Sequence, residues 1–546
     1  MRAPLAVTIA GLAALAAVVY GPHVAHGGFI SDDWANADGF RHLPDAGYWS
    51  SVEGLRHAFG ARPLLALLVP LPYAAFGTAD PTWHLVLALA IAVITSACLF
   101  SFLRAARLPW PHAAVVAALA LLFPWDSSTR LWPTVAMNNV ATCLVLLGAV
   151  AALRGLARRG LVAVVWHAAA TTLFVASVLV YEFPAPLVLA LGPLYVARAG
   201  WRRALPRWSL DVLCVGAALA WAAANTVKYR PPILDQVEWA PRVVKGLAGL
   251  TARTAIPLGL HGTPLVLLAA VLAAGAGAAL LLLRRLAPGD RGREPLRLWL
   301  AVAAGAALAA LVGSLLEILS VYFEPLAPGI YNRGNIAICG PIALLAWALV
   351  MLIVTLVTRA LRDRAPRLSS SVAVLAAALV LTGLAVGARR DADRWDRAAA
   401  ESRRVLAAIG RLGPLPSETT IYTFGHAAQS APGIPVFFDT WDLNGAARLV
   451  TGDPSLRAYP AYRGARFRCR ASGIATSLPA PTGFLSGGAP HPFEGVPEWG
   501  PDPGARYGRT VFLDVASGTS TPIRDREQCA RAARRFAPGP LQLGGT

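Results

Sequence analysis

Apolar segments recur along the first 388 residues of the chain and are separated by short polar connections. The first, from Ala3 to Tyr20, contains no charged residue and is long enough to cross a bilayer at about 1.5 Å per residue. No small-residue cleavage site follows it, so we interpret it as a retained span and not as a signal peptide. The pattern predicts a mainly α fold, a polytopic transmembrane helical bundle of about 11 spans. The other expected spans are residues 82–103, 111–124, 135–153, 161–181, 184–197, 209–225, 262–283, 297–319, 336–358 and 370–388.

The apolar stretch from Arg62 to Gly77 is left out of this count. It is short, and Pro63, Pro70 and Pro72 interrupt it. We expect a re-entrant or interfacial segment, which is tolerated at membrane depth only where the protein covers its broken backbone.

The arginine clusters between the spans support this choice. Arg2 precedes the first span and favours a cytoplasmic N-terminus. Every cluster then falls on the cytoplasmic side, whereas a crossing at 62–77 would move all of them outside. The remaining spans place the C-terminus outside the membrane. The clusters lie in the connections 104–110, 154–160, 198–208, 284–296 and 359–369.

The composition changes at Arg389, where Gly, Pro, Arg and Asp become frequent and no apolar run is long enough to cross a membrane. We expect a charged helix over 389–413, followed by strands such as Thr420 to Phe424 and Pro435 to Phe438. The chain therefore divides into a transmembrane domain, residues 1–388, and a small extracytoplasmic α+β domain, residues 389–546.

The overall composition supports a membrane protein. Hydrophobic residues make up 56% of the chain and charged residues 14%, with a mean hydropathy of +0.53. This leaves too little polar surface for a soluble globule. The net charge of +19 could suggest a nucleic-acid partner, but most arginines lie in the short connections that set topology. We therefore expect no nucleic-acid partner.

The six cysteines fall into two groups. Four lie in apolar segments, where cysteine packs as a small hydrophobic residue. Cys469 and Cys529 are the two in the polar C-terminal region, and an even count in an oxidising compartment suits one disulfide. Two free thiols are the alternative.

The sequence Phe29-Ile30-Ser31-Asp32-Asp33-Trp34 places two adjacent carboxylates just beyond the first span, at the outer membrane surface. Basic residues lie on neighbouring outward loops. This combination suits transfer of a sugar from a polyprenyl-phosphate donor, in which one carboxylate takes the proton from the attacking hydroxyl. Cationic side chains would stabilise the departing lipid phosphate as its charge grows.

The order of apolar span, Asp-Asp-Trp, the segment from Gly60 to Leu64 (Gly-x-Arg-Pro-Leu), further spans and outer C-terminal domain resembles bacterial GT-C glycosyltransferases. This superfamily of membrane enzymes includes protein O-mannosyltransferases. The resemblance is topological over residues 1–388. It implies that Asp32 or Asp33 is the general base, that Asp126 is the acid of the second outward loop, and that Arg62 contacts phosphate. It also implies a bacterial inner (plasma) membrane location.

Further outward-facing residues are candidates for substrate binding. Tyr331, Asn332 and Arg333 form the best second phosphate site, and Arg130 and Glu182 lie at span ends near the same surface. Four of the candidate residues have a structural alternative. Arg62 could extend to the interface, Asp126 and Arg130 could form a loop ion pair, and Glu182 could mark a helix end.

These observations leave two other functions open. A transporter or flippase of polyprenyl-linked sugars would use the acids as a proton or ion site, although such sites usually lie at mid-membrane depth in broken or repeated helices. A non-catalytic cell-envelope assembly protein is the second alternative. The expected partners are a polyprenyl-phosphate sugar, membrane lipid and a glycan, lipid or protein acceptor. No cofactor is required by the pattern, and the carboxylate pair leaves a divalent cation as an option.

Overall fold

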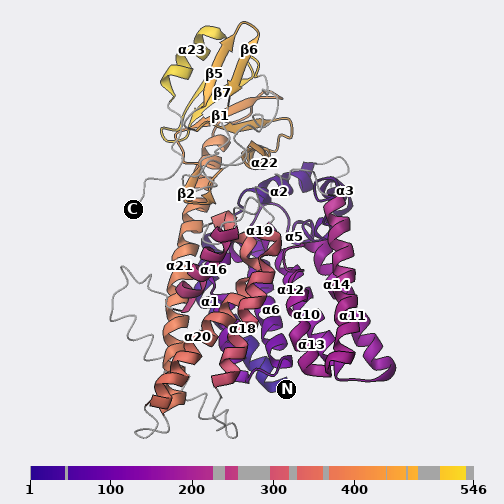
Figure 1. The fold of residues 1–546 in the computed structure, drawn as a ribbon. Helices are drawn as coiled ribbons and strands as arrows, with labels where there is room; N and C mark the ends of the chain where they lie inside the picture. The colour runs from indigo at the N-terminus through magenta and orange to yellow at the C-terminus, as the bar shows by residue number, and fades with distance from the viewer. Residues whose placement is uncertain are drawn as a thin grey trace.

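The computed structural model describes residues 2–42, 47–225, 240–255, 296–318, 329–360, 368–437, 440–462, 465–477 and 505–536. A bundle of helices carries a smaller domain of strands and helices at one end (Figure 1). The described residues are therefore mainly helical, and their sheets lie in the C-terminal part.

In the part of the chain that the structure describes, eight helices are long and apolar enough to cross a membrane. They coincide with eight of the expected spans. They are α1 (Arg2–His26), α6 (Thr82–Ala105), α10 (Asn139–Leu156), α11 (Gly160–Val180), α14 (Trp201–Ala224), α18 (Leu296–Gly313), α20 (Cys339–Ala360) and α21 (Leu368–Gly410).

Two expected spans differ from this description, and the structure does not describe a third. The segment 111–124 forms the short helix α7 (Trp110–Leu121), and 184–197 is divided between α12 (Leu187–Ala190) and α13 (Gly192–Ala199). The segment 262–283 lies outside the described residues. A helix of 12 residues, such as α7, is about 18 Å long, so it does not by itself cover the hydrocarbon thickness.

The segment 62–77 forms two short helices, α4 (Pro63–Leu68) and α5 (Leu71–Phe76). Pro63 occupies the first helical position of α4, and the break falls beside Pro70. Leu65 and Tyr73 are buried in a cluster with Phe29, so neighbouring parts of the protein cover this segment.

Short helices build the end of the bundle beside the C-terminal domain. They lie in three regions that contain candidate site residues, residues 27–81, 124–136 and 329–337, which we call the first, second and third outward regions after the side of the membrane expected from the sequence. These helices are α2 (Asp32–His42), α3 (Tyr48–Ala58), η1 (Pro124–Asp126), α8 (Ser128–Leu131), α9 (Pro133–Ala136), α19 (Leu315–Ile318) and η2 (Gly329–Ala337), while α16 (Ala240–Ala255) packs against α20.

Helix α21 joins the two parts of the molecule without a break (Figure 1). The expected domain boundary at 388/389 lies inside this helix. The Arg403 guanidinium donates hydrogen bonds to the backbone oxygens of His26 (3.0 Å) and Gly27 (2.9 Å). The outer half of α21 is therefore fastened to the chain that leads from α1 to the acidic pair.

The outer domain contains a four-stranded sheet in the order β4-β1-β7-β8. Strand β1 pairs in parallel with β4 and β7, with Ile421 opposite Ala458 and Val511, and β7 pairs antiparallel with β8. Two antiparallel pairs, β2-β3 and β5-β6, complete it. The elements are β1 (Thr420–Phe424), β2 (Gln429–Ala431), β3 (Ile434–Pro435), α22 (Thr440–Thr451), β4 (Arg457–Pro460), β5 (Arg466–Arg470), β6 (Gly473–Ser477), β7 (Thr510–Asp514), β8 (Thr519–Ile523) and α23 (Arg526–Arg535).

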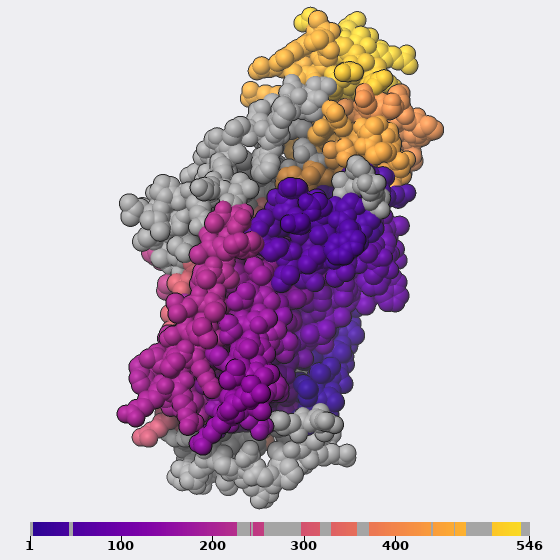
Figure 2. Space-filling view, turned by 90° about the vertical axis from the view of Figure 1, so that its right-hand side faces the viewer, coloured from indigo at the N-terminus to yellow at the C-terminus, as the bar shows by residue number. Residues whose placement is uncertain are grey.

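Helix α22 packs directly on α2. A Cβ atom at Gly445 would lie 2.7 Å from the backbone oxygen of Trp34, so only glycine permits this approach. Arg448 of α22 donates a 3.2 Å hydrogen bond to Asp38 of α2. In Figure 2 the orange surface of the outer domain lies against the indigo surface of the first outward region. The outer domain thus covers the helix that begins with the acidic pair.

Candidate functional site

The acidic pair begins helix α2 at a sharp change of chain direction. Ser31 has a φ of 48°, in the left-handed region, and the amide of Asp33 donates to the backbone oxygen of Ile30 at 3.0 Å. The first helical turn follows at once, so the side chains of Asp32 and Asp33 leave the backbone in different directions and meet different surroundings.

The Asp33 carboxylate is fully buried and has two backbone donors. Its Oδ2 accepts from the amide of Ile30 at 2.9 Å, and its Oδ1 accepts from the amide of Thr134 at 2.8 Å. Burial raises the pKa of Asp33 to about 7, although these hydrogen bonds oppose the rise. Because Thr134 belongs to the second outward region, this carboxylate joins the first and second regions.

Asp32 is partly exposed, and the outer domain contacts it directly. The indole Nε1 of Trp441, on α22, donates a 3.1 Å hydrogen bond to its Oδ1. Burial raises the pKa of Asp32, whereas the charge of Arg333 and hydrogen bonds from Trp441 and Ser31 lower it. Asp32 is therefore the member of the pair that combines partial access with a neighbouring cation.

Arg333 supplies that cation from the third outward region. Its side chain is exposed, and its guanidinium carbon lies 5.6 Å from the centroid of the buried Trp132 ring. No carboxylate within the described ranges comes within 4 Å of this guanidinium. A phosphate oxygen can therefore bind Arg333 without first displacing a close ion-pair partner from those ranges.

Asn332, beside it, is buried and anchors η2. Its Oδ1 accepts from the Ser128 hydroxyl at 2.7 Å, and its Nδ2 donates to the Ser127 hydroxyl oxygen at 3.0 Å. Asn335 adds a 2.5 Å bond to the backbone oxygen of Trp125. Of the predicted triplet, the structure therefore exposes Arg333, buries Asn332 and leaves Tyr331 half-buried.

Asp126 and Arg130 lie beneath this surface as a buried pair. The Arg130 Nη2 is 3.6 Å from the Asp126 Oδ2, and the guanidinium donates to the backbone oxygens of Ala120 (2.7 Å), Phe123 (3.0 Å) and Asp126 (2.6 Å). Burial raises the pKa of Asp126 to about 7 against the opposing charge of Arg130. The geometry fits a cation that holds the second outward region together from the inside.

Arg62 and Glu182 meet across the bundle end. The Nε and Nη2 atoms of Arg62 donate to the two oxygens of Glu182 at 2.8 and 2.6 Å. The guanidinium carbon lies 4.5 Å from the centroid of the Tyr181 ring. Burial opposes the charged form of Arg62, but Glu182 outweighs it and raises the pKa of Arg62. Both side chains remain partly exposed, at 28% and 23%, so a ligand can reach this pair.

A metal-binding cluster is not evident here. No group of three His, Cys, Asp or Glu side chains in the described ranges is placed to hold a metal ion. The option of a divalent cation near Asp32 and Asp33 stays a prediction.

The predicted residues fall into three groups in space. Asp32 lies near Arg333, Arg62 is paired with Glu182, and Asp126 is paired with Arg130. Sequence reasoning missed Trp441, because it reaches Asp32 from a position 409 residues away. It also missed Thr134, whose part in the site is a backbone amide and so leaves no signal in the side-chain pattern.

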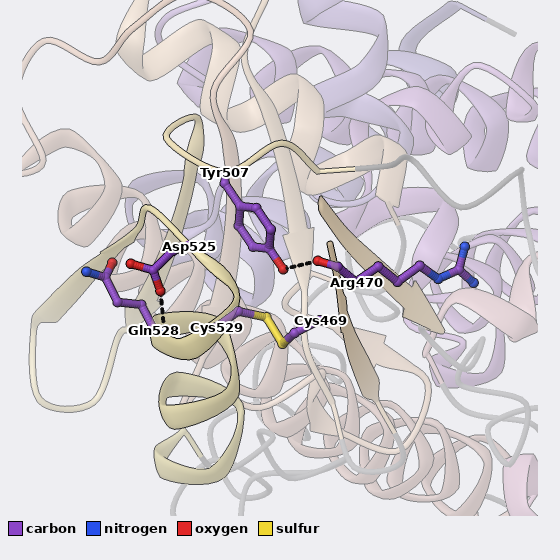
Figure 3. Close-up of a disulfide and its surroundings, with 6 residues drawn as sticks. All are labelled: Cys469, Arg470, Tyr507, Asp525, Gln528 and Cys529. Carbon is purple, nitrogen blue, oxygen red and sulfur yellow. Dashed lines mark hydrogen bonds between the residues drawn. A yellow bond between two sulfur atoms is a disulfide. The ribbon is translucent and has the colours of Figure 1, made fainter. Parts of the chain in front are cut away.

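Cys469 and Cys529 form a disulfide with a Cα–Cα distance of 5.9 Å (Figure 3). The bond connects β5 to α23. Asp525 caps α23 by accepting a 2.8 Å hydrogen bond from the Gln528 amide. The disulfide thus links two elements at the end of the outer domain that is remote from the bundle.

The chain is similar to solved structures of one membrane protein. No protein-family model matches the chain, and no curated protein matches it. Among solved structures, the chain is similar to ArnT from Cupriavidus metallidurans bound to undecaprenyl phosphate, with 14% identity and a TM-score of 0.39 over 82% of this chain and 85% of that one. The apo state of the same protein gives 15% identity and a TM-score of 0.35 over the same shares. TM-scores below 0.5 are too low to carry a functional argument.

Proposed function

We propose that this membrane protein is a glycosyltransferase that moves a sugar from a polyprenyl-phosphate donor to an acceptor on the extracytoplasmic side. The observation that carries the proposal is the difference between the two adjacent carboxylates. Asp33 is locked by two backbone amides, whereas Asp32 is partly accessible beside Arg333. This reaction needs an acid that the acceptor can reach, a second acid that positions it, and an exposed cation that can bind the phosphate.

In the proposed reaction, Asp32 is the general base. The acceptor hydroxyl attacks the anomeric carbon, its proton passes to the Asp32 carboxylate, and the bond between the anomeric carbon and the phosphate oxygen breaks. The products are the glycosylated acceptor and the polyprenyl phosphate. Arg333 stabilises the negative charge that grows on the departing phosphate.

Arg333 also connects donor binding to the basicity of Asp32. In the free protein its charge lowers the pKa of Asp32 and so helps to keep the carboxylate ionised. A bound phosphate offsets that charge, which lets the pKa of Asp32 rise. The base therefore becomes a better proton acceptor when the donor is in place.

Asp33 and Trp441 are positioning residues in this account. Asp33 fixes the start of α2 against Thr134, and Trp441 fixes the Asp32 carboxylate from the outer domain. Neither is required to touch the donor. Their contribution is to hold the base in the orientation that proton transfer needs.

Arg62 and Glu182 are proposed as a second site for the donor phosphate. The ion pair uses Nε and Nη2 of Arg62, so the N–H groups of Nη1 can bind a phosphate oxygen while Glu182 stays in place. Asp126 and Arg130 are assigned a structural part, because both are buried and the guanidinium is occupied by three backbone oxygens.

A carrier of polyprenyl-linked sugars is the second candidate, and one observation favours it. Asp211 is buried inside the spanning helix α14 and accepts hydrogen bonds from Thr171 (2.6 Å) and Tyr195 (2.7 Å). Ionisable residues within a span often belong to proton or ion pathways. A carrier would depend on Asp211, whereas the proposed transferase depends on Asp32.

The experiment uses purified protein in nanodiscs with radiolabelled polyprenyl-phosphate sugars and a mixed pool of envelope acceptors. Release of polyprenyl phosphate that is lost in Asp32→Asn and kept in Asp211→Asn supports the transferase. In proteoliposomes, movement of the intact donor that is lost in Asp211→Asn and kept in Asp32→Asn would instead favour the carrier.

A further inference from the structure

Strand β5 presents a row of arginines on one face of the outer domain. Arg466, Arg468 and Arg470 are exposed, while Phe467 and Cys469 between them are partly buried against the aromatic core. Successive side chains of a strand point to opposite faces, so the three guanidinium groups share the outer face. Alternate residues along a strand are about 6.6 to 6.8 Å apart. We call these three residues the arginine row.

The described side chains of the neighbouring strand β6, Gly473 to Thr476, carry no charge that could neutralise the arginine row. On β6, Arg468 lies opposite Ala475 and Arg470 opposite Gly473. Within the residues that the structure describes, no carboxylate lies within 4 Å of any of the three guanidinium groups. Like charges this close repel one another. An anion with several charges would relieve that repulsion.

Two other arginines of the same domain have close ion-pair partners. Arg509 pairs with Glu418 at 2.6 Å, and Arg531 forms an ion pair with Glu527. The positive charge of the domain is therefore partly neutralised at these two positions, whereas the described residues place no carboxylate in ion-pair contact with the arginine row.

The strand is held rigidly from its other face. Cys469, in the middle of the arginine row, is bonded to Cys529 of α23, and the Phe467 ring lies 5.0 Å from that of Phe512. Tyr507 donates a 2.6 Å hydrogen bond to the backbone oxygen of Arg470, whose side chain points away from the disulfide (Figure 3). A fixed strand lowers the entropy that binding costs.

The position of the arginine row excludes the protein's own membrane as its partner. The β5-β6 pair lies in the part of the outer domain remote from the helical bundle, and β1 and α22 lie between them (Figure 1). Lipid headgroups around the spanning helices are on the far side of these elements. A ligand must therefore approach from the space outside the membrane.

We propose that the arginine row binds a linear polyanion with regularly repeated phosphate groups, and that this polymer is the acceptor that the enzyme glycosylates. The second clause rests on the function proposed above. Arginine suits this ligand because its planar fork can form two parallel hydrogen bonds with one phosphate. Tethering at the arginine row would keep a long acceptor near Asp32 between transfers.

The test measures binding of fluorescent poly(glycerol phosphate) to the full-length protein in nanodiscs of uncharged lipid. The triple variant R466A/R468A/R470A should bind about 3- to 100-fold more weakly, the range expected when three exposed ion pairs are lost. Binding to the wild type should weaken steeply with added salt. The triple lysine variant keeps the positive charge but lacks the planar fork of arginine. Its affinity for the polymer should lie between those of the wild type and the triple alanine variant.

The matched control is R509A/R524A/R531A, which removes the same charge from other parts of the domain. It should bind within about twofold of the wild type, since ion pairs already occupy two of its arginines. If both triple alanine variants lose the same binding affinity, the effect depends only on net charge and the proposal is overturned. Unchanged binding in R466A/R468A/R470A, with an unchanged melting temperature, would also overturn it.

Vesicle and transfer arms separate the remaining outcomes. The arginine row could instead be needed for binding phosphatidylglycerol vesicles, with no binding of poly(glycerol phosphate). That result would overturn the proposal of a polymer ligand and favour a second membrane as the partner. If the polymer binds through the arginine row but the protein transfers no sugar, the binding proposal is supported and the proposal that the polymer is the acceptor is rejected. If the triple alanine variant transfers sugar and binds the polymer as the wild type does, the transferase proposal is supported and the arginine row is rejected as the binding site.

Discussion

The indole nitrogen of Trp441 donates a 3.1 Å hydrogen bond to the Asp32 carboxylate, and so joins the outer domain to the proposed general base. The contact depends on the close packing of α22 on α2, where Gly445 lies against the backbone of Trp34. The outer domain therefore contributes a contact to the proposed site, and its loss should affect catalysis without any contact between this domain and the donor.

The first prediction concerns Trp441→Phe. The hydrogen bond lowers the pKa of Asp32, so its loss should raise that pKa further above the ordinary aspartate value. A base acts when ionised, and kcat/KM falls as the pH drops through its pKa. The acidic limb of the pH profile should therefore move to higher pH, and the maximal rate should fall roughly 10- to 100-fold through misorientation. Trp49→Phe, at an exposed position, is the control and should leave the profile unchanged.

The second prediction concerns Arg333→Gln. Loss of the neighbouring charge should also raise the pKa of Asp32, because that charge lowers it now. Unlike Trp441→Phe, this change should also raise the KM for the donor, since the phosphate loses a cation. Measurement of kcat and KM across pH separates the two variants. An unshifted acidic limb in Arg333→Gln would argue against coupling between this cation and the base.

The third prediction concerns Asp33→Asn. The amide can accept one of the two backbone hydrogen bonds, but its NH₂ group would face the other donor and leave a buried N–H without an acceptor. The cost should be about 1 to 3 kcal/mol of stability. Thermal unfolding in detergent should show a lower melting temperature for Asp33→Asn than for Asp32→Asn. Equal melting temperatures would contradict the assignment of Asp33 as the positioning residue and Asp32 as the base.

The fourth prediction concerns Arg62 and Glu182. Arg62→Ala should raise the KM for the donor and leave a carboxylate without its bidentate partner, whereas Arg62→Lys should restore only part of the affinity. A double-mutant cycle with Glu182→Gln should show a coupling energy of about 0.5 to 3 kcal/mol for stability. Donor affinity that is unchanged in all of these variants would remove the pair from the binding site.

The sequence predicts the bundle better than it predicts the site. Apolar runs without charge identify spans such as α6 and α11 because the requirement for long hydrocarbon-compatible helices leaves a direct pattern. The proline-interrupted stretch 62–77 was likewise recognisable, since Pro70 breaks the helix. The continuous course of α21 is not evident from the sequence, because the change in composition at Arg389 predicts a domain boundary where the backbone continues as one helix.

The site could be predicted only in part. The positions of Asp32 and Asp33 just after the first span mark them as candidate site residues, but their separate environments depend on Thr134 and Trp441, which are distant in sequence. The burial of Arg130 was also hidden, because a buried and an exposed arginine look alike in a loop sequence. Tertiary packing decides each of these points.

The most direct test of the account is the rate of sugar transfer by Asp32→Asn, compared with Asp80→Asn, at an exposed carboxylate that accepts a hydrogen bond from the Thr82 amide. Asparagine keeps the size of the side chain and removes its basicity. The account predicts that Asp32→Asn lowers turnover by roughly 100- to 10,000-fold while donor binding changes little, and that Asp80→Asn transfers at the wild-type rate. Near wild-type transfer by a folded, membrane-inserted Asp32→Asn protein would contradict the central claim.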